Sequence, residues 1–216
     1  GADSVVLCEL CHQAGFHFEI AHCNFQLRGE ESERDEKFVR SLAEKYNAKI
    51  FVKKFETKEY AEQNKTSIQV AARELRYKWF DELVEVDDRQ PTSDNQEQAS
   101  NIKHRTSYIL TAHHANDNIE TLLMNFFNGT GITGLQGILT KQKKIIRPLL
   151  FAKREEIVQF INENNLEFVE DSSNASDKYT RNYFRHQLIP SIQKVFPQVE
   201  ENLLNNIERF KDIEIL

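Results

Sequence analysis

The chain is organised around one stretch, Thr111-Ala112-His113-His114-Ala115-Asn116-Asp117-Asn118-Ile119-Glu120-Thr121. It follows a short apolar run, Tyr108-Ile109-Leu110, and it opens a segment with helical periodicity. Apolar residues recur there at intervals of three and four, the pattern of one buried helix face: Ile119, Leu122, Leu123, Phe126 and Phe127. The polar stretch therefore lies where a predicted strand ends and a helix begins, which is where open α/β sheets bind their ligands.

Three side chains of this stretch are candidates for chemistry. On a helix Asp117 and Glu120 are three residues apart and Thr121 is four from Asp117, so all three are neighbours near the first turn. His113, at the end of the strand, is placed to reach the same crevice. A structural alternative has equal weight, because Asp117 followed by Glu120 also fits a capping box.

Composition bounds the class of protein. The chain has 216 residues, 39% of them hydrophobic, which indicates one large domain with at most a small appendage. We expect no membrane span and no secretory signal, because no apolar run approaches about 18 residues. Three cysteines, Cys8, Cys11 and Cys23, are too few for a disulfide framework and favour a reducing, cytoplasmic setting. Core packing is the favoured role of Cys8 and Cys11, ahead of metal or redox chemistry.

Strand and helix patterns alternate along the chain. Strands are expected at 16–22, 49–54, 108–110 and 145–150, and helices at 30–46, 67–86, 153–164 and 198–216. A further helix opens the chain, with Asp3 or Ser4 as its N-cap. This order predicts a doubly wound, mostly parallel sheet with helices on both faces, of the α/β class, followed by a helical segment. The polar residues 87–105 read as an inserted loop.

Two further clusters have a functional and a structural interpretation each. Four of the seven glycines fall in the nine residues Gly129–Gly137, which fits either a turn-rich connection or a loop beside a ligand. Arg181 and Arg185 flank Tyr183 and Phe184, a composition suited to phosphate contact and base stacking. This cluster stands out because the chain as a whole has a net charge of −6. Arginines 73 and 76 share a helix, where a solvated face is the structural alternative.

Taken in order, these segments resemble the tRNA(Ile)-lysidine synthases, a family of the PP-loop (N-type) ATP pyrophosphatase group. Gly1-Ala2-Asp3-Ser4 is similar to the end of that group's Ser-Gly-Gly-x-Asp-Ser phosphate loop, and the opening stretch to Ala-His-His-x-x-Asp-x-x-Glu-Thr. Other segments that resemble family motifs are His22–Arg28, Ala72–Tyr77, Gly129–Gly137, Arg147–Leu150, Glu170–Asn174 and Arg181–Arg185. Phe25 and Asn116 depart from the pattern, where the family commonly has histidine and aspartate.

The resemblance implies a ligase that uses ATP and Mg²⁺. It would join free L-lysine to C2 of the wobble cytidine of the CAU-anticodon isoleucine tRNA, through an adenylated tRNA. Implied catalytic residues are His113, Asp117, Glu120 and Arg181, with Glu120 positioning or deprotonating the lysine amine. Implied ATP contacts are Gly1, Asp3, Ser4, His22, Asn24 and Arg28, with Asp3 also a Mg²⁺ ligand. Implied tRNA contacts are Arg73, Arg76, Arg181 and Arg185.

The resemblance also implies a domain division. Residues 1–190 would form the catalytic domain, with its first strand and the start of its phosphate loop missing, and 191–216 a helical linker towards an absent tRNA-binding region. A homodimer is left open. Two rival functions remain: a tRNA thiolase of the same group, which would need catalytic cysteines, and an ATP-binding module without catalysis.

Overall fold

The computed structural model describes residues 1–88, 107–170, 172 and 180–214. The predicted loop from residue 89 onward and most of the Glu170–Asn174 segment lie outside the described residues. Two compact units make up the chain: residues 10–109, and residues 1–9 together with 110–216. The boundaries fall within α1 (Ala2–Gln13) and β3 (Ile109–Leu110). Each unit has a hydrophobic cluster of its own.

The 10–109 unit is a strand–helix–strand unit with two further helices. Strands β1 (Ile20–Asn24) and β2 (Ile50–Lys54) are parallel, with Ile20 opposite Ile50, and α2 (Glu30–Lys45) connects them. Helices α3 (Thr57–Gln63) and α4 (Ile68–Asp88) follow β2. The parallel pairing and its helical crossover confirm the predicted α/β class for this unit. Ser67 caps α4, because its hydroxyl oxygen accepts the Val70 backbone N–H at 3.2 Å.

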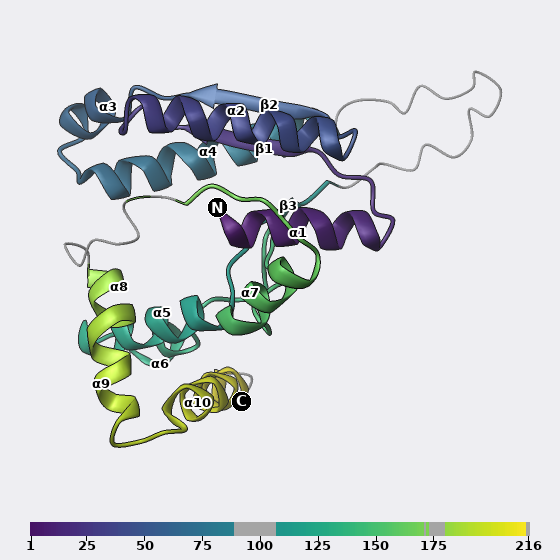
Figure 1. The fold of residues 1–216 in the computed structure, drawn as a ribbon. Coiled ribbons are helices and arrows are strands. Elements are labelled where there is room, and N and C mark those ends of the chain that lie inside the picture. The colour runs from purple at the N-terminus through teal and green to yellow at the C-terminus, as the bar shows by residue number, and fades with distance from the viewer. Residues whose placement is uncertain (89–106, 171, 173–179, 215–216) are drawn as a thin grey trace, which may run out of the picture. The chain divides into compact units, whose positions relative to one another are not determined.

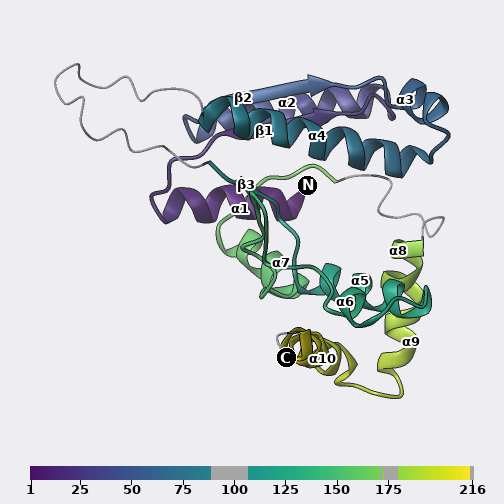
Figure 2. The same ribbon diagram turned by 180° about the vertical axis from the view of Figure 1, so that it is seen from behind.

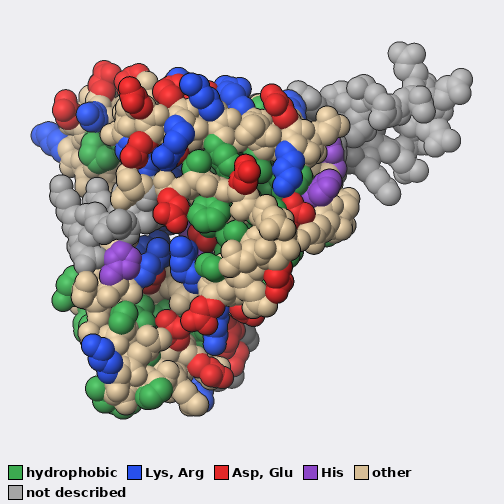
Figure 3. Space-filling view, in the orientation of Figure 1, with side chains coloured by type: hydrophobic (Ala, Val, Ile, Leu, Met, Phe, Trp, Pro, Cys, Tyr) green, Lys and Arg blue, Asp and Glu red, His purple; other side chains and the backbone are tan. Residues whose placement is uncertain are grey.

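Alternating side chains of the two strands face different helices. Asn24 of β1 and Lys54 of β2 bond to Glu36 and Glu33 of α2. The neighbouring positions, Cys23 and Phe51, pack instead in a cluster with Trp79 and Phe80 of α4. Because successive strand residues point to opposite faces, α2 and α4 cover the two faces of this sheet, as Figure 1 and the reverse view in Figure 2 show. The outer face of α2 carries acidic and basic side chains side by side (Figure 3).

The unit formed by 1–9 and 110–216 places helices around a small sheet. Its strands are ordered β3–β5–β4, with β5 at Ile145–Ile146 and β4 at Lys141–Gln142. Its helices are α5 (Ala115–Phe127), α6 (Ile132–Leu135), α7 (Arg154–Glu163), α8 (Thr180–Tyr183), α9 (Ile189–Gln193) and α10 (Val199–Glu214), with a π-helical turn, η2, at Phe184–Leu188. The core joins α5, η2, α9 and α10 through Ile119, Leu123, Phe184, Ile189, Leu203 and Leu204.

Several predicted details are wrong. Helix α1 begins at Ala2, so Asp3 lies in its first turn and neither Asp3 nor Ser4 caps it. Strand β5 pairs antiparallel with β4 and ends at Ile146. Phe126 and Phe127, predicted to be buried, are 61% and 62% exposed. Within the described part of the chain, no helix combines the length and apolarity that a bilayer crossing requires.

Candidate active site

The site is built on the first two turns of α5. His114 is the N-cap residue, and its backbone N–H donates to Asp117 Oδ2 at 3.1 Å. Asp117 is therefore the third helical residue. The predicted capping box, with Asp117 as the cap and Glu120 as its partner, is wrong: His114 is the cap and Asp117 is its partner. An acidic side chain at this position also faces the positive end of the helix dipole. Glu120 therefore takes no part in this capping box.

Glu120 instead meets two arginines that come from more than sixty residues later in the chain. Arg185 Nε donates to Glu120 Oε1 at 2.6 Å and its Nη2 donates to Oε2 at 3.1 Å, a bidentate pair. The same Nη2 reaches Asp117 Oδ1 at 3.2 Å, and Arg181 Nε lies 3.5 Å from Glu120 Oε2. We call these four residues the carboxylate–arginine cluster. The predicted closeness of Asp117 and Glu120 is confirmed, and two predicted arginines join them.

Burial within the cluster is graded. Glu120 is 0% exposed, whereas the side chains of Arg185 and Arg181 are 24% and 40% exposed. Burial raises the pKa of Glu120 above its usual value, and the Arg185 guanidinium opposes that rise. The cluster therefore has a dry carboxylate at its base and Arg181 at its rim. Arg181 also donates from Nη2 to Thr121 Oγ1 at 2.9 Å, which fixes its direction.

A change of helix type places the two arginines. Arg181 lies on α8 and Arg185 on η2, where the helix widens to a π-helical turn. Short π-helical turns are uncommon and frequently occur at functional sites. Phe184 on this turn is buried in the core beside Ile119, so the backbone at Arg185 is anchored. The sequence pattern of residues 180–188 gives no sign of this turn.

Asp3, His114 and Arg154 lie beside the cluster. Asp3 Oδ1 is 3.6 Å from Arg154 Nη1 and, within the described residues, it accepts no hydrogen bond although the atom is buried. His114 is 1% exposed, and its Nδ1 makes no hydrogen bond to the part of the chain that is described. Burial lowers the pKa of His114, with Asp117 and then Asp3 acting in the opposite direction. His114 and Arg154 are site residues that the sequence analysis did not name.

His113, which the sequence analysis favoured over His114, has a different contact. Its Nδ1 is 3.0 Å from Thr111 Oγ1, within hydrogen-bond distance, and the side chain is half-buried. Gly1 precedes α1, and its carbonyl oxygen accepts the Val5 N–H at 3.3 Å; Ser4 is exposed on the first turn. Catalysis by His113 and ATP contact by Gly1 and Ser4 stay predictions.

The remaining ATP candidates lie in the 10–109 unit and are held by α2. Asn24 is 2% exposed; its Nδ2 donates to Glu36 Oε2 at 3.0 Å and its Oδ1 accepts the Gln26 N–H at 3.0 Å. Arg28 Nη2 donates to Asp35 Oδ2 at 3.0 Å. Burial lowers the pKa of His22, against the effect of Glu36, so this histidine is held neutral. Asn24 thus has a structural role here, whatever else it contacts.

The two arginines proposed for tRNA contact on α4 are exposed and lie over aromatic rings. The Arg73 guanidinium lies 4.9 Å from the centre of the ring of Tyr77, four residues later on the same helix. Arg76 lies 5.2 Å from the centre of the Phe25 ring. Cation–π contacts of this kind hold the guanidinium plane while its edge stays open to solvent.

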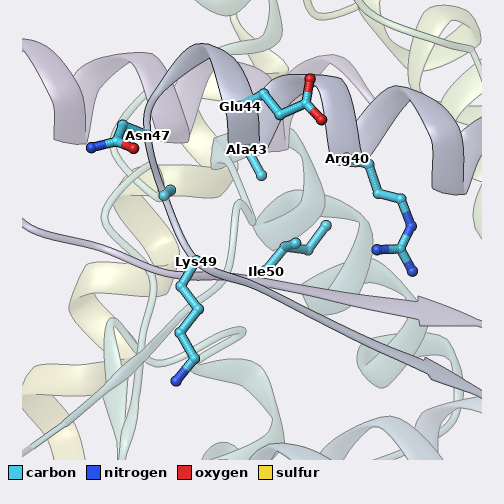
Figure 4. A pocket seen from close by; sticks show the side chains of 7 residues that line it. Arg40, Ala43, Glu44, Asn47, Lys49 and Ile50 are labelled. Atoms are coloured by element: carbon cyan, nitrogen blue, oxygen red, sulfur yellow. The ribbon is translucent and has the colours of Figure 1, made fainter.

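Two surface hollows are lined by residues other than the four of the cluster. One of about 410 Å³ lies where α2 ends and β2 begins, with Arg40 and Lys49 at its edge (Figure 4). The other, of about 620 Å³, is lined by α7 residues with Asn116 and Glu200. Asn116 bridges two elements there, since its Oδ1 accepts the Arg154 N–H at 2.9 Å and its Nδ2 donates to Glu200 at 3.3 Å. An aspartate at position 116 would lack the second bond.

The glycine-rich loop after α5 is packed against its own chain at two positions. A Cβ on Gly134 would collide with the Thr130 side chain, and one on Gly137 with Asn118 Oδ1. Gly137 also has a φ of 65°, which favours glycine. Close packing therefore explains these two glycines. Gly131 has open space around its Cα, so packing gives no reason for glycine there.

The cysteines have the character of core residues. Burial raises the pKa of Cys11, and it raises that of Cys23 to about 11. The two thiols are therefore protonated near neutral pH, which disfavours them as nucleophiles or metal ligands. Cys8, on the same helix as Cys11, is half-buried. In the part of the chain that is described, no group of three or more metal-binding side chains gathers at one place.

Curated relatives match the chain along almost its whole length. It is 43% identical over 213 residues to a tRNA(Ile)-lysidine synthase of Bacteroides thetaiotaomicron, covering 99% of this chain and 46% of that protein. Proteins of the same name from Parabacteroides distasonis and Thermosipho africanus are 38% and 36% identical, covering 100% and 99% of this chain and 45% and 47% of their own lengths. The chain thus spans about half the length of these relatives.

A solved structure and a family model agree on the fold. The U34-tRNA thiolase NcsA of Methanococcus maripaludis, solved with its 4Fe-4S cluster, matches with a TM-score of 0.69 over 97% of this chain and 68% of its own. At 17% identity that likeness concerns the fold alone. The model of an ATP-binding family, described as PP-loop domain, matches residues 1–92 and 96–192. The chain therefore belongs to the PP-loop family of ATP-binding domains.

Proposed function

We propose that this chain carries the catalytic part of a tRNA(Ile)-lysidine synthase. The reaction joins free L-lysine to the wobble cytidine of the CAU-anticodon isoleucine tRNA at the expense of ATP. The observation that carries the proposal is the carboxylate–arginine cluster beside Asp3, which lies in the segment Gly1–Ser4 that resembles part of the phosphate loop. The relatives named tRNA(Ile)-lysidine synthase, which match nearly the whole chain, support it.

The reaction has two steps with different demands. The cytidine O2 attacks the α-phosphorus of ATP, and pyrophosphate leaves. The lysine ε-amine then attacks C2, the C2–O bond breaks, AMP leaves with that oxygen, and the amine loses its proton. The first step develops negative charge on phosphate and the second needs a cationic substrate to be bound and deprotonated. A site with both guanidinium and carboxylate groups meets both demands.

Arg181 is the cluster residue best placed for the phosphate. Its side chain is the more exposed of the two arginines, and its Nη2 is already directed by Thr121. Arg185 is held by two carboxylates and has less freedom to leave them. We therefore assign Arg181 to the charge that develops on the reacting phosphate, and Arg185 to holding the carboxylates at their spacing.

Asp117 and Glu120 are the candidates for the lysine amine. Both oxygens of Glu120 accept hydrogen bonds from Arg185, so Glu120 can take a proton from the amine only after that pair loosens. Asp117 is 14% exposed in its side chain, whereas Glu120 is buried beneath it. Asp117 is thus the carboxylate that an incoming ammonium group meets first, with Glu120 below it.

The fit of Asp3 to a metal ion rests on one atom. Mg²⁺ prefers oxygen ligands and is commonly held by one or two carboxylates together with substrate phosphates. Asp3 Oδ1 is buried and accepts no hydrogen bond among the described residues, so it has a free lone pair for such an ion. When bound with ATP, Mg²⁺ would neutralise phosphate charge; Asp3 would hold it, and Arg154 would hold Asp3.

The test is pyrophosphate release and labelled-lysine incorporation by this chain. We expect pyrophosphate release that needs the CAU-anticodon isoleucine tRNA, and lysine incorporation that needs ATP. Lysine-independent transfer of sulfur to tRNA, or ATP binding without any tRNA-dependent pyrophosphate release, would overturn the proposal. Cys11 and Cys23 give a thiolase no accessible thiolate, so we do not favour that rival.

A further inference from the structure

Three aromatic side chains lie exposed near the cluster, in the same unit. Phe126 and Phe127 at the end of α5 are 61% and 62% exposed, and Tyr183 on α8 is 52% exposed. We call these three residues the aromatic surface. Figure 3 shows hydrophobic side chains at the left edge of the view, over α8 and the end of α5. Exposed aromatic rings gathered at one place mark an interaction site more often than single exposed residues do.

The aromatic surface is continuous with the catalytic face of α5. Phe127 follows Glu120 by seven residues, or two helical turns, so both lie on one face of the helix. The Phe127 ring contacts the buried Phe184 ring with centroids 5.8 Å apart, and the Phe126 ring contacts Phe127 at 5.6 Å. The rings are therefore fixed relative to the arginine-bearing helix rather than free to turn.

The loop beyond these rings is ordered by its own hydrogen bonds. Asn125 Nδ2 donates to the Gly134 carbonyl at 2.7 Å, and Thr130 Oγ1 donates to the Asn125 carbonyl at 3.1 Å. Ile138 N–H donates to Asn118 Oδ1 at 2.6 Å. These bonds tie the loop back to α5 along its length. A ligand that meets the rings thus finds a platform already formed, which lowers the entropy cost of binding.

Charge distinguishes the classes of partner. Residues 121–140 contain no Asp, Glu, Lys or Arg, although 29% of the chain is charged. In the carboxylate–arginine cluster, the guanidinium of Arg181 is 40% exposed. Arg181 lies on α8, two residues before Tyr183. A ring-bearing segment that has no carboxylates of its own, with an exposed guanidinium on the neighbouring helix α8, suits a polyanion whose unpaired bases offer flat faces.

We propose that the aromatic surface stacks on unpaired bases of an RNA loop while an adjoining nucleotide lies at the carboxylate–arginine cluster. This inference rests on the proposed function, because that function supplies the RNA. It adds the residues that hold the bases beside the reacting one. Base stacking on Phe126, Phe127 and Tyr183 accounts for their exposure, and Arg181 remains assigned to the reacting phosphate of ATP.

The test is binding of a CAU-anticodon stem-loop RNA in which 2-aminopurine replaces a loop base next to the wobble cytidine. Stacking on a protein ring quenches the fluorescence of this base. We expect quenching with the unchanged chain, and loss of quenching with about tenfold weaker binding for Phe126→Ala and for Phe127→Ala. Phe127→Trp should keep both, because an aromatic face remains. Phe151→Ala is the matched control, since Phe151 is 79% exposed elsewhere in the same unit and should change neither.

Each outcome decides something. Equal quenching and affinity in Phe126→Ala, with the thermal melt unchanged, would overturn the stacking proposal. Variants that bind RNA normally but lose self-association in sedimentation would show a contact between copies instead. An unchanged chain that binds no stem-loop RNA refutes the proposed function. If the unchanged chain incorporates lysine while the aromatic variants bind RNA and quench normally, the stacking proposal is refuted and the proposed function stands.

Discussion

Glu120→Gln is the substitution whose consequences the structure defines best. Glutamine keeps the shape of the side chain but removes its charge. One carboxylate oxygen that accepted a hydrogen bond from Arg185 is replaced by an NH2 group, so two donors then face each other. Glu120 is 0% exposed, so water cannot replace the lost acceptor. Arg185 keeps one bond to the remaining, now uncharged, carbonyl oxygen and its bond to Asp117 Oδ1 at 3.2 Å, and it loses one of its two bonds to residue 120. A partly buried guanidinium loses its bidentate partner.

Removing one member of a buried ion pair costs about 3–5 kcal/mol, because the other charge stays behind unpaired. Arg185 is 24% exposed and retains Asp117, so we expect the lower end, about 3 kcal/mol of unfolding free energy. For a domain of this size the loss lowers Tm by on the order of 10 °C. Urea unfolding followed by circular dichroism measures it, because the helices of this unit contribute to the signal.

The matched control is Glu208→Gln on α10 of the same unit. Glu208 forms a 2.7 Å ion pair with Lys211, and its side chain is 68% exposed. Exposed pairs of this kind contribute little, so we expect no measurable change. A loss below about 1 kcal/mol for Glu120→Gln, like that of a surface pair, would refute the claim that Glu120 is the buried anchor of the two arginines.

Local geometry gives three other predictions. Gly137→Ala should lower the unfolding free energy by about 1–3 kcal/mol, because its φ is 65° and a Cβ would collide with Asn118, whereas Gly131→Ala, with open space, should be neutral in the same urea assay. Burial lowers the pKa of His114 in the folded chain, so the unfolded chain binds a proton at a higher pH than the folded chain does. The free energy of unfolding should therefore fall as the pH drops below about 6.5. A His114→Asn variant that loses stability just as steeply would show that His114 is not the cause. Cys23, with a pKa of about 11, should react with iodoacetamide far more slowly near neutral pH than after denaturation, and fast alkylation of the folded chain would contradict its burial.

Local sequence patterns predicted several helices and strands of the 10–109 unit. The strand at residues 49–54 and the helix at 30–46 agree with β2 and α2 within a residue. The strand has a continuous apolar run, Ile50-Phe51-Val52, and the helix has a charged outer face. Helix α3 was missed, since seven residues with mixed polarity give no period to detect. The strand predicted at 16–22 starts later, at Ile20, because pairing with Ile50 rather than propensity sets where the ladder begins.

The sequence pointed to all four residues of the carboxylate–arginine cluster, but not to which of them pair. Helical spacing alone places Asp117 beside Glu120. The partner of each carboxylate depends on Arg181 and Arg185, which lie more than sixty residues later in the chain than Glu120. It also depends on the π-helical turn that carries Arg185, and helical spacing predicts neither. Spacing of three fitted a capping box as well as a ligand site. The choice needed the position of the helix start, and that is set by His114 one turn earlier.

Phe126 and Phe127 show what periodicity cannot tell. They continue the apolar spacing of Ile119 and Leu123 without a break, so a pattern count assigns all four to one buried face. Burial, however, depends on what is packed against each turn. Phe184 and Ile189 cover the middle of α5, while the last turn reaches beyond them and leaves both rings exposed. One helix therefore carries the two carboxylates in its first two turns, core residues in its middle and exposed rings at its end. The chemistry at the first turn and the contact surface at the last are held in fixed register by the same backbone.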